Sequence, residues 1–261
     1  MNDDERIEEK RKLSSPTIYE IISREGDEEL KRPATSLAWS GVAAGICISF
    51  ALLAQGFLAR YLPETDASTL LIKTGYVFGF LIVIMSRLQL FTENTITVIL
   101  PLLERRTMRT LMRTARLWGI VFVTNMIGTF IVALMIYGHH KYFGAPIEHF
   151  VEISKHAVLR DGVALFFEAI PAGFLIAAMV WMMPTAHGSE FFVLFSMIYL
   201  IALGNFAHVV AGSAEAFLLV LTGDASIGAA TQFILAAGVG NVIGGTGLFA
   251  LLAYAQVQSE L

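Results

Sequence analysis

The sequence has little charge and almost no cysteine. Only 15% of its 261 residues are charged and 56% are hydrophobic, whereas a soluble globular domain averages about 25% charged and about 45–50% apolar residues. An ordinary soluble enzyme is therefore excluded. The single cysteine, Cys47, excludes an internal disulfide. The first 37 residues are polar, with no short apolar stretch near Met1, so we expect no cleaved secretory signal.

Long apolar segments account for most of the chain. A helix needs about 20 apolar residues to cross a bilayer, and by this measure the sequence predicts six spans, over residues 36–60, 68–100, 114–138, 160–184, 190–222 and 228–256. The second and fifth are too long for one simple crossing, and each contains a polar patch, at 87–94 and 204–215. We interpret both as broken helices, whose interrupted backbone must be lined by protein or water.

The distribution of Lys and Arg predicts the orientation of the spans. Seven Lys and Arg residues lie in residues 1–37 and five in residues 105–116. With six spans, these two segments lie on the same side of the membrane, and the other side has at most five Lys and Arg residues. Cytoplasmic loops carry the excess of positive charge, so both termini are predicted to be cytoplasmic. In the tail, Ser15-Pro16 predicts a helix start. Ile18, Ile21 and Ile22 give that helix an apolar stripe, suited to the membrane surface or a neighbouring subunit.

A short pattern occurs twice, 116 residues apart, in Asn125-Met-Ile-Gly128 and Asn241-Val-Ile-Gly244. The same offset takes Thr92 in the second-span break to His208 in the fifth. We therefore predict an all-α membrane fold of two inverted three-span repeats, with a substrate path at the midplane between the paired breaks. The predicted domains are a tail (1–35), a six-span pore domain (36–256, with repeats at about 36–138 and 160–256) and a C-terminal tail (257–261). Glycine pairs at one-turn spacing, Gly41/Gly45 and Gly240/Gly244, indicate closely packed helices.

Over about residues 30–256 the sequence resembles the formate/nitrite transporter family, and most of all its YfdC-type branch. The motifs are Leu90-Phe91-Thr92 with Asn94, Phe206-Ala207-His208, Asn125-xx-Gly128, and Gly240-Asn241-Val-Ile-Gly244-Gly245. The resemblance implies an aquaporin-like fold and a homopentamer in the plasma (bacterial inner) membrane, with one pore per protomer. It also implies passage of small monovalent anions or their conjugate acids.

The same resemblance assigns residue roles. Thr92 and His208 would be the paired polar residues at the pore centre, and Leu90, Phe91 and Phe206 would form the apolar constrictions around them. Many members carry acids where this chain has Gln89 and Ala207, and well-known members carry a pore-facing asparagine where it has Ala177. Because of these departures, the resemblance does not identify the substrate.

The polar residues of the spans each have two interpretations. His208, the only one of six histidines inside a span, is either satisfied by a neighbouring helix or donates a hydrogen bond or proton, through or beside Thr92, to an anion. A bare ion in an apolar ring loses its hydration, whereas a neutral acid does not. Asn94 and Glu93 either hold freed backbone groups, which is the expected role, or contact the substrate as part of the pore. Arg87 would snorkel or pair with Glu93, or attract anions as a fixed charge.

The remaining candidates are acids, a lysine and loop histidines. Glu168 and Glu215 either form pairs or helix hydrogen bonds, or take part in a proton relay. Lys73 anchors the interface or weakly attracts anions. His149, Glu152 and His156 would share a face if their segment is helical, but this spacing is common in surface helices, so we expect no metal.

The leading hypothesis is thus a pentameric channel or proton-coupled transporter for small anions. Its partners would be the anion, a proton and the bilayer, with no cofactor, no nucleic acid and no enzymatic activity. The alternatives are an aquaporin-like channel for neutral solutes, a structural protein with a sealed pore, and an intramembrane hydrolase using Ser213 with His208. The hydrolase would lack a second base and an oxyanion motif.

Overall fold

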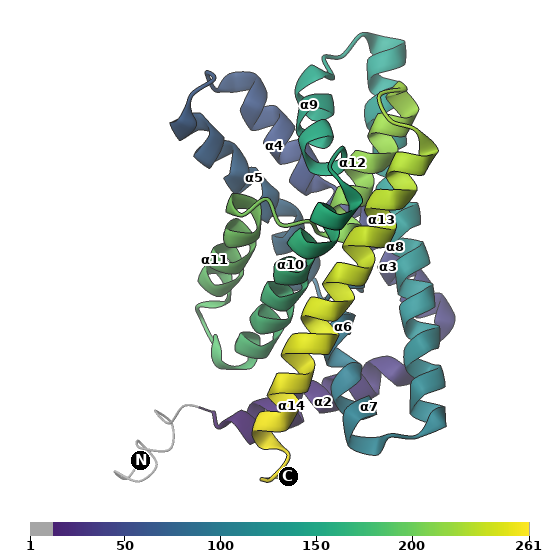
Figure 1. Ribbon diagram of the computed structural model, residues 1–261, viewed down its shortest axis with the longest axis vertical. Coiled ribbons are helices and arrows are strands. Elements are labelled where there is room, and N and C mark those ends of the chain that lie inside the picture. Colours follow the sequence, from purple (N-terminus) through teal and green to yellow (C-terminus); the bar gives the residue numbers. More distant parts are fainter. Residues whose placement is uncertain (1–12, 261) are drawn as a thin grey trace.

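The computed structural model describes residues 13–260, which form helices joined by short loops (Figure 1). In the first half these are α2 (Ser15–Lys31), α3 (Ala34–Ile48), α4 (Phe50–Tyr61), α5 (Asp66–Met85), α6 (Asn94–Thr97), α7 (Ile99–Arg105) and α8 (Met108–Phe143). The second half has α9 (Glu148–Val158), α10 (Gly162–Met182), the short η1 (Met183–Thr185), α11 (Glu190–Leu203), α12 (Val209–Thr222), α13 (Ile227–Val242), the π-helical η2 (Ile243–Ala250) and α14 (Leu251–Val257).

Five helical stretches of the described residues are long and apolar enough to cross a membrane, at 34–61, 66–85, 108–143, 162–185 and 227–257. The shorter apolar helices α11 and α12 occupy the predicted fifth span. Both predicted breaks are present, because α5 ends at Met85 and α11 ends at Leu203 well before the next helix starts. The chain is an all-helical, multi-pass membrane protein.

Helix α2 crosses one end of the bundle, beneath the long helices (Figure 1). It begins where the sequence predicts, with Ser14 capping the backbone N–H of Thr17 and a proline in its first turn. Its apolar stripe packs on α6, α7 and α14 of the same chain, and the Tyr19 hydroxyl donates to the Leu100 carbonyl at 3.0 Å. For Ile18 and Ile22, which are buried, the expectation that the stripe faces the membrane surface or a neighbouring subunit is therefore wrong, whereas Ile21 is half-buried. Residues 1–12 of the predicted tail lie outside the described residues.

Glycines bring two pairs of helices into backbone contact. A Cβ on Gly128 of α8 would overlap the Val42 carbonyl and the Gly45 Cα of α3. A Cβ on Gly244 of η2 would likewise overlap the Ile170 carbonyl and the Phe174 amide of α10. The pair α3–α8 belongs to the first half of the chain and the pair α10–η2 to the second.

Candidate functional site

The two breaks have the same backbone conformation. Arg87 and Asn205 each adopt a left-handed conformation, with φ of 53° and 52°. The next amide in each break, of Leu88 and Phe206, donates to a carbonyl five residues earlier at 3.0 Å. The helices α5 and α11 therefore end in the same way.

These matching residues are 118 positions apart, not 116. The residue equivalent to His208 in the first break is accordingly Leu90, so the sequence-based pairing of Thr92 with His208 as equivalent positions is corrected. The two-residue difference arises after the breaks. There the first half forms the interrupted helices α6 and α7, whereas the second half forms the continuous α12.

Two buried asparagines satisfy the backbone that the breaks leave free. The Asn125 side chain accepts from the Phe91 amide at 2.9 Å and donates to the Gly41 and Gln89 carbonyls at 2.9 and 2.8 Å. Asn241 repeats this arrangement, accepting from Val209 at 2.9 Å and donating to the carbonyls of Ala169 and Ala207 at 2.8 and 2.9 Å. An unsatisfied backbone group in the membrane costs several kcal/mol. These residues, predicted to pack helices, therefore also hold the breaks in place.

Thr92 and His208 meet between the two breaks. Thr92 Oγ1 lies 2.7 Å from His208 Nε2, and both side chains are buried. His208 also caps α12, its Nδ1 accepting the Ala211 amide hydrogen at 3.2 Å. A neutral imidazole has one donor and one acceptor nitrogen, so the ring proton must be on Nε2. His208 therefore donates to Thr92, and the Thr92 hydroxyl hydrogen is left for another acceptor.

Aromatic and aliphatic side chains surround this pair. The Phe80 ring lies edge-on to the His208 imidazole, with centroids 4.9 Å apart. Phe91 packs edge-on against Trp118 and Phe122 with centroids at 5.6 and 5.0 Å, and Leu90 is fully buried. Leu90 and Phe91, the predicted constriction residues of the second-span break, are thus buried among apolar side chains directly before Thr92 in the chain. Ala177, the departure in α10, is buried in the same core.

Asn94 and Gln89 form a polar link from the first break to α2. Asn94 Nδ2 donates to the Gln89 side chain and to the Leu90 carbonyl, both at 3.1 Å. Gln89 Nε2 in turn donates to Glu29 at 2.8 Å. Asn94 therefore bonds the freed backbone, in the manner expected from the sequence.

Arg87 pairs with Glu25 of α2, at 3.0 Å, and not with Glu93 as the sequence suggested. The Arg87 side chain is 77% exposed, a position in which an ion pair contributes little to stability. Among the described residues, the Glu93 carboxylate has no hydrogen bond or ion pair, whereas its backbone carbonyl accepts from Ile96 and Thr97.

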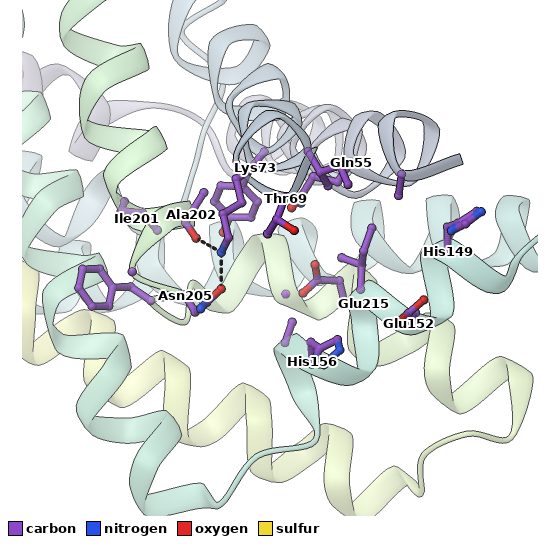
Figure 2. Close-up of a pocket in the computed structure, with 18 of the residues that line it drawn as sticks. Gln55, Thr69, Lys73, His149, Glu152, His156, Ile201, Ala202, Asn205 and Glu215 are labelled. Atoms are coloured by element: carbon purple, nitrogen blue, oxygen red, sulfur yellow. Dashed lines mark hydrogen bonds between the residues drawn. The ribbon is translucent and has the colours of Figure 1, made fainter. Parts of the chain in front are cut away.

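The helices α4, α5 and α9 lie at the end of the molecule opposite α2 (Figure 1). A cavity of about 840 Å³ opens between them and has His208 among its lining residues; Figure 2 shows part of this lining. We call it the vestibule. Its walls come from α4, α5, α9, α10, α11, the second break, α12 and α13. Phe206 lines it close to His208 in sequence, and Tyr76, Glu215 and Gln55 line it from three different helices.

Two cations of the vestibule bind the second break. Lys73 Nζ donates to the Ala202 carbonyl at 2.6 Å and to Asn205 Oδ1 at 2.5 Å (Figure 2). Arg160 donates to the Asn205 carbonyl at 3.0 Å and forms an ion pair with Glu168. Lys73 therefore holds the break in addition to adding positive charge to the vestibule, and Glu168 is paired.

The structure also places the serine and the loop histidines that the sequence named as candidates. Ser213 donates to the Val210 carbonyl at 2.7 Å and lies 2.8 Å from the Thr129 hydroxyl, and the structure gives it no hydrogen bond to His208, as a hydrolase would need. His149, Glu152 and His156 line the vestibule from α9. Between residues 13 and 260, no group of three His, Cys, Asp or Glu side chains could hold a metal ion.

Some site residues gave no clear signal in the sequence. Phe80 is one of many aromatic residues in an apolar span. Trp118, whose indole donates to the Asn94 carbonyl at 3.0 Å, lies in the predicted third span. Asn205 did offer a cue, because asparagine tolerates positive φ better than most residues and here follows a glycine at the end of a helix.

Comparison with known proteins places the chain in a family. The model of the family described as formate/nitrite transporter matches residues 16–255. The inner membrane protein YfdC of Escherichia coli (strain K12) is 40% identical over 245 residues, which cover 94% of this chain and 79% of YfdC. The uncharacterized transporter YrhG of Bacillus subtilis (strain 168) is 27% identical over 248 residues, covering 91% and 92% of the two chains.

Solved structures have the same fold. An FNT family ion channel superposes with a TM-score of 0.79 at 16% identity, covering 92% of this chain and 98% of its own. A pentameric formate channel with formate bound superposes with a TM-score of 0.69 at 18% identity, covering 87% and 98%. With a family match over nearly the whole length and a relative at 40% identity, this chain belongs to the formate/nitrite transporter family.

Proposed function

We propose that this chain conducts small monovalent anions of the formate or nitrite class, or their protonated acids, through a pore in each protomer. The observation that carries the proposal is the buried Thr92–His208 hydrogen bond of 2.7 Å, between two helix breaks at the inner end of the vestibule. Of the two roles considered for His208, hydrogen-bond donation is favoured, because its ring proton points at Thr92 and orients that hydroxyl as a donor. The hydroxyl and the surrounding rings would then stabilise a small anion or acid.

The fold is proposed to consist of six spans in two inverted repeats. This arrangement is supported by the matching left-handed conformations of Arg87 and Asn205. The matching hydrogen bonds that Asn125 and Asn241 form with the two breaks also support it. The Lys and Arg count supports cytoplasmic termini in the inner membrane, and the relative named as an inner membrane protein agrees with that location. The solved formate channel is described as pentameric, which supports a homopentamer here.

Flux into liposomes tests the proposal. Purified full-length protein is reconstituted and exposed to sodium formate or sodium nitrite, and internal acidification is followed with a trapped dye. We expect acidification that replacement of His208 by asparagine abolishes. Unchanged and equally pH-dependent transport by that variant would contradict the role of His208.

Two further assays separate the alternative functions. Swelling with uncharged solutes, without acidification by formate or nitrite, would indicate an aquaporin-like channel for neutral solutes. Hydrolysis of an ester substrate would indicate an enzyme. If none of the tested solutes crosses the membrane, the protein would have a sealed pore.

A further inference from the structure

We propose that Glu215 carries the proton that neutralises the anion in the vestibule. This inference rests on the proposed transport of weak-acid anions and adds the residue that supplies the proton. Glu215 lies on α12, seven residues after His208, so its side chain lies on the same helix face and about 10 Å further along the axis. Both residues line the vestibule.

The Glu215 carboxyl is buried and has no partner. Its side chain is only 5% exposed, and none of the hydrogen bonds or ion pairs among the described residues involves its carboxyl group. Ionised acids inside a membrane protein are almost always paired, as Glu168 is with Arg160. A buried and unpaired carboxyl facing a cavity is a group that binds and releases a proton.

His208 is poorly placed to deliver that proton. Its Nδ1 accepts a hydrogen bond from the Ala211 amide, and its only N–H points at Thr92. A doubly protonated ring would have to give up the contact with Ala211, since both nitrogens would then be donors. The proton therefore has to come from elsewhere in the vestibule.

The other ionisable groups facing the vestibule are less suited. From α5 come Lys73 and Tyr76, with Asp66 at its start and Glu64 in the loop before it; from α9 come His149, Glu152 and His156; and Arg160 and Glu168 come from α10 and the segment before it. Lys73, Arg160 and Glu168 are bonded to protein groups, and Glu152 is exposed. The described parts of α8 and α13 add no titratable side chain to the vestibule, and α4 adds Gln55.

The step balances without any co-reactant. An anion entering the vestibule takes the proton of the Glu215 carboxylic acid: the O–H bond of Glu215 breaks, and an O–H bond forms on the anion. The neutral acid passes the apolar layer around Thr92 and His208, because it has no charge to desolvate. The Glu215 carboxylate then regains a proton from vestibule water, and until it does so its charge repels the next anion.

Formate flux into liposomes tests this role with three variants of the full-length protein. Glu215→Gln keeps the shape but cannot release a proton, Glu215→Asp restores an acid, and Glu152→Gln removes a vestibule carboxylate that is exposed. We expect Glu215→Gln to slow formate-driven acidification at neutral outer pH by roughly a hundredfold, the lower range for a positioned proton donor. The deficit should shrink at acidic pH, where bulk water supplies formic acid. Glu215→Asp should keep the wild-type pH profile, and Glu152→Gln, which removes a negative charge from the vestibule, should not slow the flux.

An infrared difference spectrum on adding formate provides a second readout. The wild type should lose a carboxylic-acid C=O band that Glu215→Gln lacks. A Glu215→Gln variant with the wild-type rate and pH profile would overturn the inference, as would an equal loss in Glu152→Gln. A wild type that conducts no anion at all would instead overturn the proposed function. In that case, a C=O band unaffected by formate would overturn the role of Glu215 as well.

Discussion

At the scale of single residues, the hydrogen bonds from the Ala211 amide to His208 and from His208 to Thr92 explain why position 92 is a threonine. Thr92 accepts the Nε2 proton of His208, and its own hydroxyl hydrogen stays available. A serine supports the same bonds, but an apolar side chain of equal size does not. The hydroxyl and the imidazole therefore act as one unit, and each depends on the orientation of the other.

Replacing Thr92 by valine should lower stability and stop anion flux. The His208 donor would remain buried without an acceptor, which costs about 1–3 kcal/mol. Thr92→Ser should keep most of both properties. Thermal denaturation in detergent and liposome flux measure the two effects, and a Thr92→Val protein with wild-type flux would show that the hydroxyl is not needed.

The three hydrogen bonds formed by each of Asn125 and Asn241 give a second prediction at this scale. Asn125→Ala and Asn241→Ala each leave one amide and one carbonyl of a break, and one carbonyl of a neighbouring helix, without this partner. At about 1–3 kcal/mol for each unsatisfied buried group, both variants should lose about 3 kcal/mol or more, and by similar amounts. Thr231→Ala is the matched control on α13, because its exposed hydroxyl bonds only the Ile227 carbonyl. A small effect of either asparagine variant would show that water can replace the amide.

At the scale of helices, two glycines of α8 differ in how closely a neighbouring helix packs against them. Gly128 touches the α3 backbone, whereas an added Cβ on Gly119 meets nothing within 4 Å. Gly128→Ala should therefore force α3 and α8 apart and cost about 3 kcal/mol or more, since overpacking is itself destabilising. Gly119→Ala should raise stability by roughly 0.5–1 kcal/mol, because alanine restricts the unfolded chain. Unfolding in detergent compares the two, and equal effects would exclude contact as the cause.

The loop after α12 gives a prediction about pH. Asp224 forms an ion pair with Lys155 of α9 at 2.6 Å, and the hydrogen bonds from Lys155 and Thr222 lower the pKa of that carboxyl. A lowered folded-state pKa means that the stabilisation is present above the unfolded value, about 3.9, and is lost as the pH falls below it. The hydrogen-exchange protection factors of α9, which are corrected for the slower intrinsic exchange in acid, should therefore fall below this pH. Asp224→Asn should already show the lower protection at neutral pH, and an unchanged α9 would contradict the link.

At the scale of the whole molecule, the proposed homopentamer has a simple test. Light scattering or native mass spectrometry in detergent should give a protein mass five times the 28.6 kDa of one chain. Large apolar side chains exposed on the outer helices, such as Phe78, Met135 and Phe192, could face either neighbouring protomers or lipid. A monomeric mass at low detergent concentration would assign them all to lipid.

The sequence predicted the long helices and the two breaks because an apolar run of about 20 residues is readable without any partner. It did not predict how the breaks align. The repeated Asn-x-Ile-Gly pattern has an offset of 116, and the two-residue difference lies where the halves share no motif. Contacts between distant segments were also invisible, including the hydrogen bonds of Lys73 to a break about 130 residues later and the packing of α2 on α6 and α7.

The direction of the hydrogen bonds that His208 forms with Ala211 and Thr92 bears on whether free protons can leak through the protein. From Ala211 through His208 to Thr92 every donor points the same way. A proton hopping along this chain would leave the ring with its hydrogen on Nδ1, facing the Ala211 N–H, and the ring would have to turn over before the next proton could follow. In a packed site that rotation is hindered by Phe80. The pair proposed to receive a small acid would therefore also insulate the bilayer against a leak of free protons.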